Sequence, residues 1–168
     1  MILHDSLGHQ IKEGIMKKHN LVTEKATTYY VEDSVKHLDK IEVSSKPKTF
    51  VLHVGTNNLA KKRQSPEEIL PLYMGFVDKM RVKFPGSKLV YSSIVPREDN
   101  KATQRLVRYL NAAMNRKFGG AEDVFIVDNF EIKGPRLKQR DGIHLKNDGT
   151  SALARNIRDG IKAALNII

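Results

Sequence analysis

Short apolar runs alternate along this chain with longer amphipathic segments. Four runs are short enough for buried strands, over about 2–4, 50–54, 88–95 and 124–127, and a further extended segment lies within 21–28. The alternation of such strands with helices is typical of an α/β domain. The pattern therefore predicts five strands separated by helices.

The segments between these strands carry apolar residues at helical spacing. We predict helices over about 7–18, 35–43, 65–84, 103–118 and 148–165. The Ser-Pro-Glu-Glu sequence that begins at Ser65 is a strong signal for a helix start, so we expect the chain from Gly55 to Ser65 to be a loop.

Five strands joined by helices predict a parallel sheet covered on both faces, with right-handed crossovers. We expect a flavodoxin-like three-layer α/β/α sandwich with the strand order 2-1-3-4-5. Ligands of such sheets bind at the carboxyl ends of the strands, near the switch point between the first and third strands. Ser6 follows the first strand and Asn57 follows the third. The loop with Asp141 and His144 follows the fifth strand and returns to the same edge.

Three short polar motifs lie at these places. Residues 4–8 read His-Asp-Ser-Leu-Gly, residues 55–58 read Gly-Thr-Asn-Asn, and residues 141–144 read Asp-Gly-Ile-His. Each has an ordinary interpretation, because a serine after a strand is usually a helix N-cap and Asn or Asp often stabilises a turn. The histidine could equally be a satisfied loop residue. Together, however, the three motifs hold the groups of a nucleophilic hydrolase.

Each group has a definite task in that chemistry. Ser6 would be the nucleophile and His144 the base that removes its proton, because imidazole titrates near neutral pH. Asp141 would fix the tautomer of His144 and stabilise the imidazolium. The oxyanion would be bound by the Ser6 backbone N–H and the Asn57 side-chain amide. For substrate binding, Arg97 and Tyr29 are weaker candidates, since a loop arginine is usually exposed and aromatic residues usually pack in a core.

This order of motifs resembles the SGNH (GDSL-type) hydrolase family over essentially the whole chain. The resemblance implies a serine esterase that cleaves a short acyl or lipid ester through an acyl-enzyme, with no metal or cofactor. Three departures stand out. His4 replaces a usual glycine, and Asn58 replaces an aspartate, as in acetylhydrolases similar to the platelet-activating factor enzyme. The glycine that gives the third oxyanion N–H is missing, so this donor would lie within 27–31 or be absent.

A closer resemblance is to the esterase domain in the first open-reading-frame protein of some LINE retrotransposons. It implies that residues 1–168 are one domain cut from a longer protein that also binds RNA and self-associates. The length of 168 residues fits a single domain. The chain has no cysteine, no candidate signal peptide and no long apolar run, so we expect a cytoplasmic protein.

Charge adds a second hypothesis. The chain has 29 basic and 19 acidic residues, a formal net charge of +10. Such a charge attracts anionic membranes or nucleic acid, although most charged runs are simply solvated. The basic clusters comprise Lys61, Lys62 and Arg63, then Lys133, Arg136, Lys138 and Arg140, and Arg105 with Arg108.

Three function classes therefore remain at the level of sequence. The leading one is the serine esterase. The second is a weakly active hydrolase scaffold that binds nucleic acid or a membrane, although few aromatic residues accompany the basic ones. The third is a metal hydrolase with His4, Asp5, Asp141 and His144 as ligands.

Overall fold

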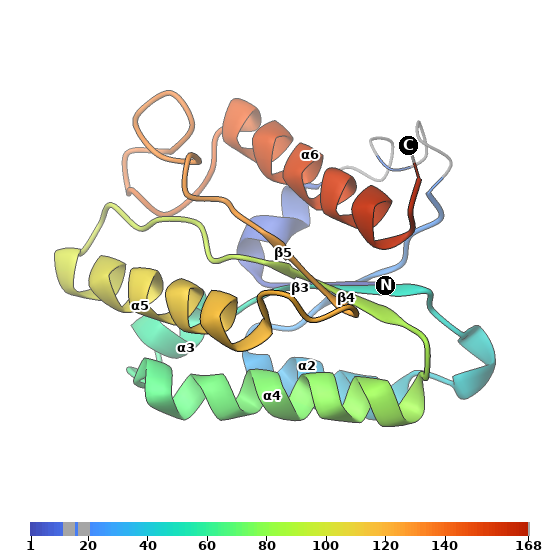
Figure 1. Ribbon diagram of the computed structural model, residues 1–168. Coiled ribbons are helices and arrows are strands. Elements are labelled where there is room, and N and C mark those ends of the chain that lie inside the picture. The colour runs from blue at the N-terminus through green and yellow to red at the C-terminus, as the bar shows by residue number, and fades with distance from the viewer. Residues whose placement is uncertain (12–15, 17–20, 168) are drawn as a thin grey trace.

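The computed structural model describes residues 1–11, 16 and 21–167. Its sheet is parallel throughout and has the order β2-β1-β3-β4-β5, which confirms the predicted topology (Figure 1). The strands are β1 (Ile2–His4), β2 (Lys25–Thr27), β3 (Thr49–His53), β4 (Lys88–Ser92) and β5 (Val124–Val127). The α-helices are α2 (Val31–Lys40), α3 (Thr56–Ala60), α4 (Pro66–Lys83), α5 (Lys101–Phe118) and α6 (Asn147–Ala164). Two short 3-10 helices are η1 (Ser6–Gln10) and η2 (Val43–Ser45).

Alternate residues of the strands point to opposite faces of the sheet and enter two separate cores. In β3, Phe50 and Leu52 belong to the core under α2, α4 and α5, whereas Val51 belongs to the core under α6. Figure 1 shows α6 on one side of the sheet and α2, α4 and α5 on the other. The predicted three-layer sandwich is therefore confirmed.

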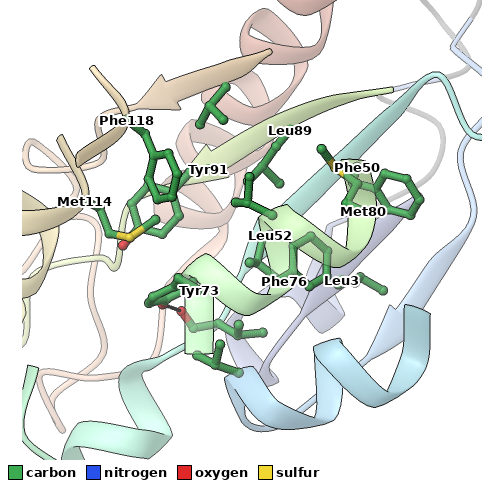
Figure 2. Close-up of a cluster of buried hydrophobic side chains, with 14 of the residues drawn as sticks. Leu3, Phe50, Leu52, Tyr73, Phe76, Met80, Leu89, Tyr91, Met114 and Phe118 are labelled. Atoms are coloured by element: carbon green, nitrogen blue, oxygen red, sulfur yellow. Dashed lines mark hydrogen bonds between the residues drawn. The ribbon is translucent and has the colours of Figure 1, made fainter. Parts of the chain in front are cut away.

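The core under α4 contains aromatic rings that contact one another (Figure 2). The Phe50 ring lies 6.3 Å from that of Phe76, and the Tyr73 ring lies 5.4 Å from that of Tyr91, both nearly edge to face. The Tyr73 hydroxyl donates a hydrogen bond of 2.6 Å to the Val54 carbonyl, so this buried phenol is satisfied at the end of β3.

The start of α4 follows the sequence signal closely. The Ser65 hydroxyl accepts from the Glu68 N–H, and the Glu68 carboxylate accepts from the Ser65 N–H, which completes a capping box. The helix predicted over 35–43 is wrong in its bounds, because α2 begins at Val31 and ends at Lys40. Asp33 closes its first turn by accepting a hydrogen bond from the Tyr30 N–H.

The segment after β3 corrects another prediction. Residues Thr56–Ala60 form the short helix α3, not an irregular loop. Gly55 precedes it with φ of 119°, a conformation that favours glycine, and a Cβ there would overlap the Tyr73 hydroxyl. Of the helix predicted over 7–18, the structure shows η1 at the start, and residues 12–15 and 17–20 lie outside the described residues.

Candidate active site

Ser6 lies at the first position of η1, directly after β1. The buried Asp5 side chain caps this helix, because its Oδ1 accepts a 3.0 Å hydrogen bond from the Leu7 N–H. The first N–H of a helix has no partner within the helix. The Ser6 N–H, in particular, has no acceptor in the part of the chain that the structure describes. The half-buried Ser6 thus offers an N–H to a bound ligand.

His4, the residue in place of the family's glycine, lies inside the protein and is buried. Its Nδ1 donates a 2.8 Å hydrogen bond to the Asp5 carbonyl. The ring packs against Gly8, where a Cβ would overlap the His4 Cβ and Cγ atoms. The His4 ring therefore fits only because residue 8 is a glycine without a side chain. Since His4 is buried, it does not line the site.

A buried histidine that sequence analysis missed lies beside the nucleophile turn. His53, at the end of β3, forms hydrogen bonds through Nδ1 with Ser92 Oγ at 3.0 Å and the Ser92 carbonyl at 3.3 Å. The buried Asn129 donates to the same hydroxyl at 2.9 Å. Burial lowers the pKa of His53 and raises the pKa of Asp5, while their opposite charges counteract both shifts. An enclosed imidazole cannot reach a substrate, so His53 is not a candidate base.

Asn57 is buried in α3 and contacts the segment between β2 and α2. Its Nδ2 donates a 3.1 Å hydrogen bond to the Tyr29 carbonyl. A side-chain amide nitrogen carries two N–H groups, so one remains for an oxyanion. Tyr29 is 50% exposed, so it does not pack in the core, and its proposed contact with substrate stays a prediction.

The region predicted to hold the third oxyanion donor is largely engaged within the protein. The Thr28 N–H donates to the His4 carbonyl, the Tyr30 N–H to Asp33 Oδ2, and the Val31 N–H to Asn58 Oδ1, at 2.8, 3.2 and 3.1 Å. Three of the five residues in 27–31 therefore direct their N–H groups at other parts of the chain.

Asn58 is fully buried and uses both ends of its amide. Its Oδ1 accepts from the Val31 N–H, and its Nδ2 donates to Glu32 Oε2 at 2.8 Å and to Gln64 Oε1 at 2.6 Å. An aspartate could accept from Val31 but could donate to neither partner. Asparagine rather than aspartate at position 58 therefore fits the two acceptors, Glu32 and Gln64, that surround its Nδ2 in this chain.

We expect Asn58→Asp to lower the free energy of unfolding by about 2 kcal/mol, since two donors are lost and a carboxylate is buried against Glu32. Urea unfolding followed by circular dichroism measures the change. The control is Asn166→Asp at an exposed position, where we expect a change below about 0.5 kcal/mol. Equal stability of the two variants would show that the Asn58 amide is not required.

Asp141 and His144 form a hydrogen-bonded pair on the loop after β5. His144 Nδ1 donates to Asp141 Oδ2 at 2.5 Å, and Asp141 Oδ1 accepts from the Ile143 and His144 N–H groups at 2.9 Å each. The hydrogen bond from His144, followed by those two backbone bonds, lowers the pKa of Asp141 to about 2. The carboxylate is therefore ionised at neutral pH and holds the tautomer that leaves His144 Nε2 free to accept a proton.

This pair lies at the same sheet edge as Ser6 and Asn57. The loop contacts the segment after β4, where the Glu98 N–H donates to the Gly142 carbonyl at 3.0 Å. Among the described residues, no hydrogen bond joins the Ser6 hydroxyl to His144. Such bonds often form only in the substrate complex, and both side chains of the pair are about half exposed at this edge.

Arg97 occupies a different position from the one expected of a loop arginine. It is 9% exposed, and its guanidinium donates to both Asp99 carboxylate oxygens at 2.9 and 2.6 Å and to Thr56 Oγ1 at 3.2 Å. Arg97 thus joins the segment after β4 to α3, next to Asn57. Its charge is thus already paired within the protein, and a contact of Arg97 with substrate stays a prediction from the sequence.

Among the residues that the structure describes, the metal-hydrolase alternative finds no group of ligands. Within residues 1–11, 16 and 21–167, no three or more His, Cys, Asp or Glu side chains converge as a metal site. His4 and Asp5 are buried, whereas Asp141 and His144 are about half exposed.

Of the predicted basic clusters, only Lys138 is withdrawn from the surface, because it is buried. Lys133 covers the Phe130 ring at 3.8 Å and Lys62 is paired with a glutamate of α2, but both stay exposed. Arg136 and Arg140 are exposed as well. As for membranes, no helix in the described ranges is both long and apolar enough to cross a bilayer.

Comparison with known proteins yields one curated relative and many similar folds. No protein-family model matches the chain. The platelet-activating factor acetylhydrolase IB subunit beta homolog of Drosophila melanogaster is 38% identical over 134 residues, which cover 71% of this chain and 55% of that protein. The chain therefore spans about half the length of this relative.

Two solved structures illustrate the shared fold. A carbohydrate esterase family 3 structure from Talaromyces cellulolyticus has a TM-score of 0.80 and 16% identity, and the match covers 100% of this chain and 98% of that chain. A GDSL-like lipase from Bacteroides thetaiotaomicron has a TM-score of 0.74 and 12% identity, with 97% and 87% covered. The chain has the fold of the SGNH (GDSL-type) hydrolases.

Proposed function

We propose that this protein is a serine esterase in which Ser6, His144 and Asp141 act as nucleophile, base and orienting carboxylate. The observation that carries the proposal is the 2.5 Å hydrogen bond between His144 and an ionised Asp141, on a loop at the carboxyl edge of the sheet. Ser6 and Asn57 follow β1 and β3 at that edge. An imidazole held in this way is arranged to accept a proton.

The reaction proceeds in two halves. Ser6 Oγ attacks the ester carbonyl while its proton passes to His144 Nε2, and the Ser6 N–H and the Asn57 amide bind the oxyanion. The protonated imidazole then gives its proton to the leaving alcohol, which leaves an acyl group on Ser6. Water, deprotonated by His144, attacks this acyl-enzyme and releases the acid and free Ser6.

We infer a short, acetyl-like acyl group as the substrate class. The relative in Drosophila melanogaster is named an acetylhydrolase homolog, and the similar structures include carbohydrate esterases. The ester could be carried by a lipid or by a sugar. The link to a LINE retrotransposon protein, and the anionic membrane or nucleic acid as a partner, stay predictions from the sequence.

Covalent labelling tests this proposal without knowledge of the natural ester. We expect a fluorophosphonate probe to attach to the peptide that contains Ser6, because a serine activated by a base attacks phosphorus and loses fluoride. Mass spectrometry of the digested protein locates the adduct. We also expect p-nitrophenyl acetate to be hydrolysed faster than the octanoate ester.

The same labelling in the presence of excess p-nitrophenyl acetate is the control, and we expect the substrate to slow it. An adduct on a different serine would reject Ser6 as the nucleophile. Hydrolysis that the fully labelled protein retains would point to a contaminating esterase.

A further inference from the structure

Lys138 is a buried lysine under the turn that carries Asp141 and His144. Only 2% of the residue is exposed, unlike its neighbours Gln139 and Arg140. Its Nζ donates to the carbonyls of Gly142 and Ile143, at 3.4 and 3.3 Å. These two peptide groups lie between Asp141 and His144, so one ammonium contacts the backbone that connects them.

The backbone around Lys138 closes the same turn. Lys138 pairs with Leu145 in an antiparallel bridge, and the Gln139 N–H donates to the His144 carbonyl at 2.8 Å. The Gly142 N–H donates to the Gln139 carbonyl at 3.1 Å. These backbone bonds close the turn between Lys138 and Leu145. The Lys138 ammonium binds two further carbonyls of the same turn, those of Gly142 and Ile143.

A second segment meets the ammonium at the Gly142 carbonyl. This oxygen also accepts from the Glu98 N–H, in the segment after β4. Gly142 has φ of 68°, and a Cβ there would approach the Asp99 nitrogen to 2.8 Å. The turn therefore packs directly against this segment, and both the segment and Lys138 bind the Gly142 carbonyl.

The surroundings of the ammonium are unusual for a lysine. Burial lowers the pKa of Lys138 to about 8; the nearby charges of Glu98, Asp141 and Asp99 raise it, while that of Arg97 lowers it further. In the described chain, Lys138 forms no ion pair, and its ammonium donates to two backbone carbonyls. A buried, unpaired ammonium is unfavourable, and an apolar residue of similar length would cost less. Its presence under these residues therefore indicates a task in the turn.

We propose that Lys138 is the positioning residue of the Asp141–His144 pair: its ammonium holds the Gly142 and Ile143 carbonyls and so keeps the carboxylate directed at the imidazole. The role rests on the proposed esterase function, because it concerns the geometry of the proposed base. It also makes that geometry depend on the charge of a group that does not touch the substrate.

Titration of the His144 imidazole by NMR tests the coupling directly. The chain has 6 histidines, and the signals of His144 are identified by their loss in His144→Gln. In the wild type we expect the His144 signals to show an inflection near pH 8, where Lys138 loses its proton. In Lys138→Met this inflection should disappear.

Activity of the variants provides the second arm. We expect Lys138→Met to lower kcat for p-nitrophenyl acetate about a hundredfold with little change in KM, because a small displacement of the base has this effect. Lys138→Arg keeps a charge at all these pH values, so it should recover part of kcat and lack the inflection near pH 8. The matched control is Lys133→Met, because Lys133 is an exposed lysine of the same loop. This variant should keep the wild-type kcat and the inflection near pH 8.

The outcomes separate the two proposals. A folded Lys138→Met with the wild-type His144 signals at every pH and kcat within twofold would overturn the role of Lys138, and so would a wild type in which the His144 signals do not respond to the ionisation of Lys138. If the wild type has no esterase activity but shows the inflection, the positioning role holds and the proposed reaction fails. If Lys138→Met does not fold, the wild-type titration and the Lys138→Arg variant still decide.

Discussion

Ser6→Ala is expected to lower kcat for p-nitrophenyl acetate by at least about a thousandfold. The alanine removes the only hydroxyl that the proposed mechanism uses as a nucleophile, and the remaining oxyanion donors cannot form an acyl-enzyme. Ser6 is at the first position of η1, and the cap of that helix comes from Asp5, so the fold should be retained. Initial rates and a thermal melt of the same preparation measure both effects.

Ser45→Ala is the matched control for this substitution. Ser45 is an exposed serine of η2, in the segment that leads into β3 and so at the opposite edge of the sheet. We expect its kcat to equal that of the wild type. If Ser6→Ala were as active as Ser45→Ala, Ser6 would not be the nucleophile and the esterase proposal would fail in its present form.

Asp141→Asn should have an effect of similar size, a fall in kcat of about ten-thousandfold. The asparagine Oδ1 can still accept from the Ile143 and His144 N–H groups, so the turn should persist. The amide nitrogen, however, would donate to His144 Nδ1 and place the imidazole proton on Nε2. That tautomer cannot accept the proton of Ser6.

The pH dependence of the same variant sharpens this test. The wild-type carboxylate has a pKa of about 2, so its own ionisation does not limit activity at neutral pH. We expect kcat of Asp141→Asn to stay low between pH 6 and 9, a range of about three units in which an ordinary histidine loses its proton. Asp148→Asn, at an exposed acid at the start of α6, is the control and should behave as the wild type. A small effect of Asp141→Asn would mean that His144 needs no carboxylate.

Most of the sheet could be predicted from sequence because four of the five strands are short apolar runs, whereas β2 has no such run and is expected only somewhere within 21–28. The capping box at Ser65 and the apolar run of β5 left few alternatives. α3 was missed because five residues are too few to show helical periodicity. Its start depends on Gly55 meeting the Tyr73 hydroxyl, a contact between residues that are distant in sequence.

The site likewise contains residues that sequence could predict and residues that it could not. Ser6, Asn57, Asp141 and His144 were predicted at one edge because their motifs follow strands in a parallel sheet. The surroundings of His53 and Lys138 were not predicted, since a polar residue at the end of a strand and a lysine in a basic loop are ordinarily exposed. A histidine within the apolar run from Phe50 to Val54 was nevertheless a readable signal.

The interlocked pair of His4 and Gly8 has a consequence for related sequences. The two positions share one fixed volume beneath the nucleophile turn, so a larger side chain at either must be matched by a smaller one at the other. In chains that carry glycine at the first position, we expect the second to accept a larger side chain. Covariation between these two sites, more than the identity of either, would mark proteins that pack their turn in this manner.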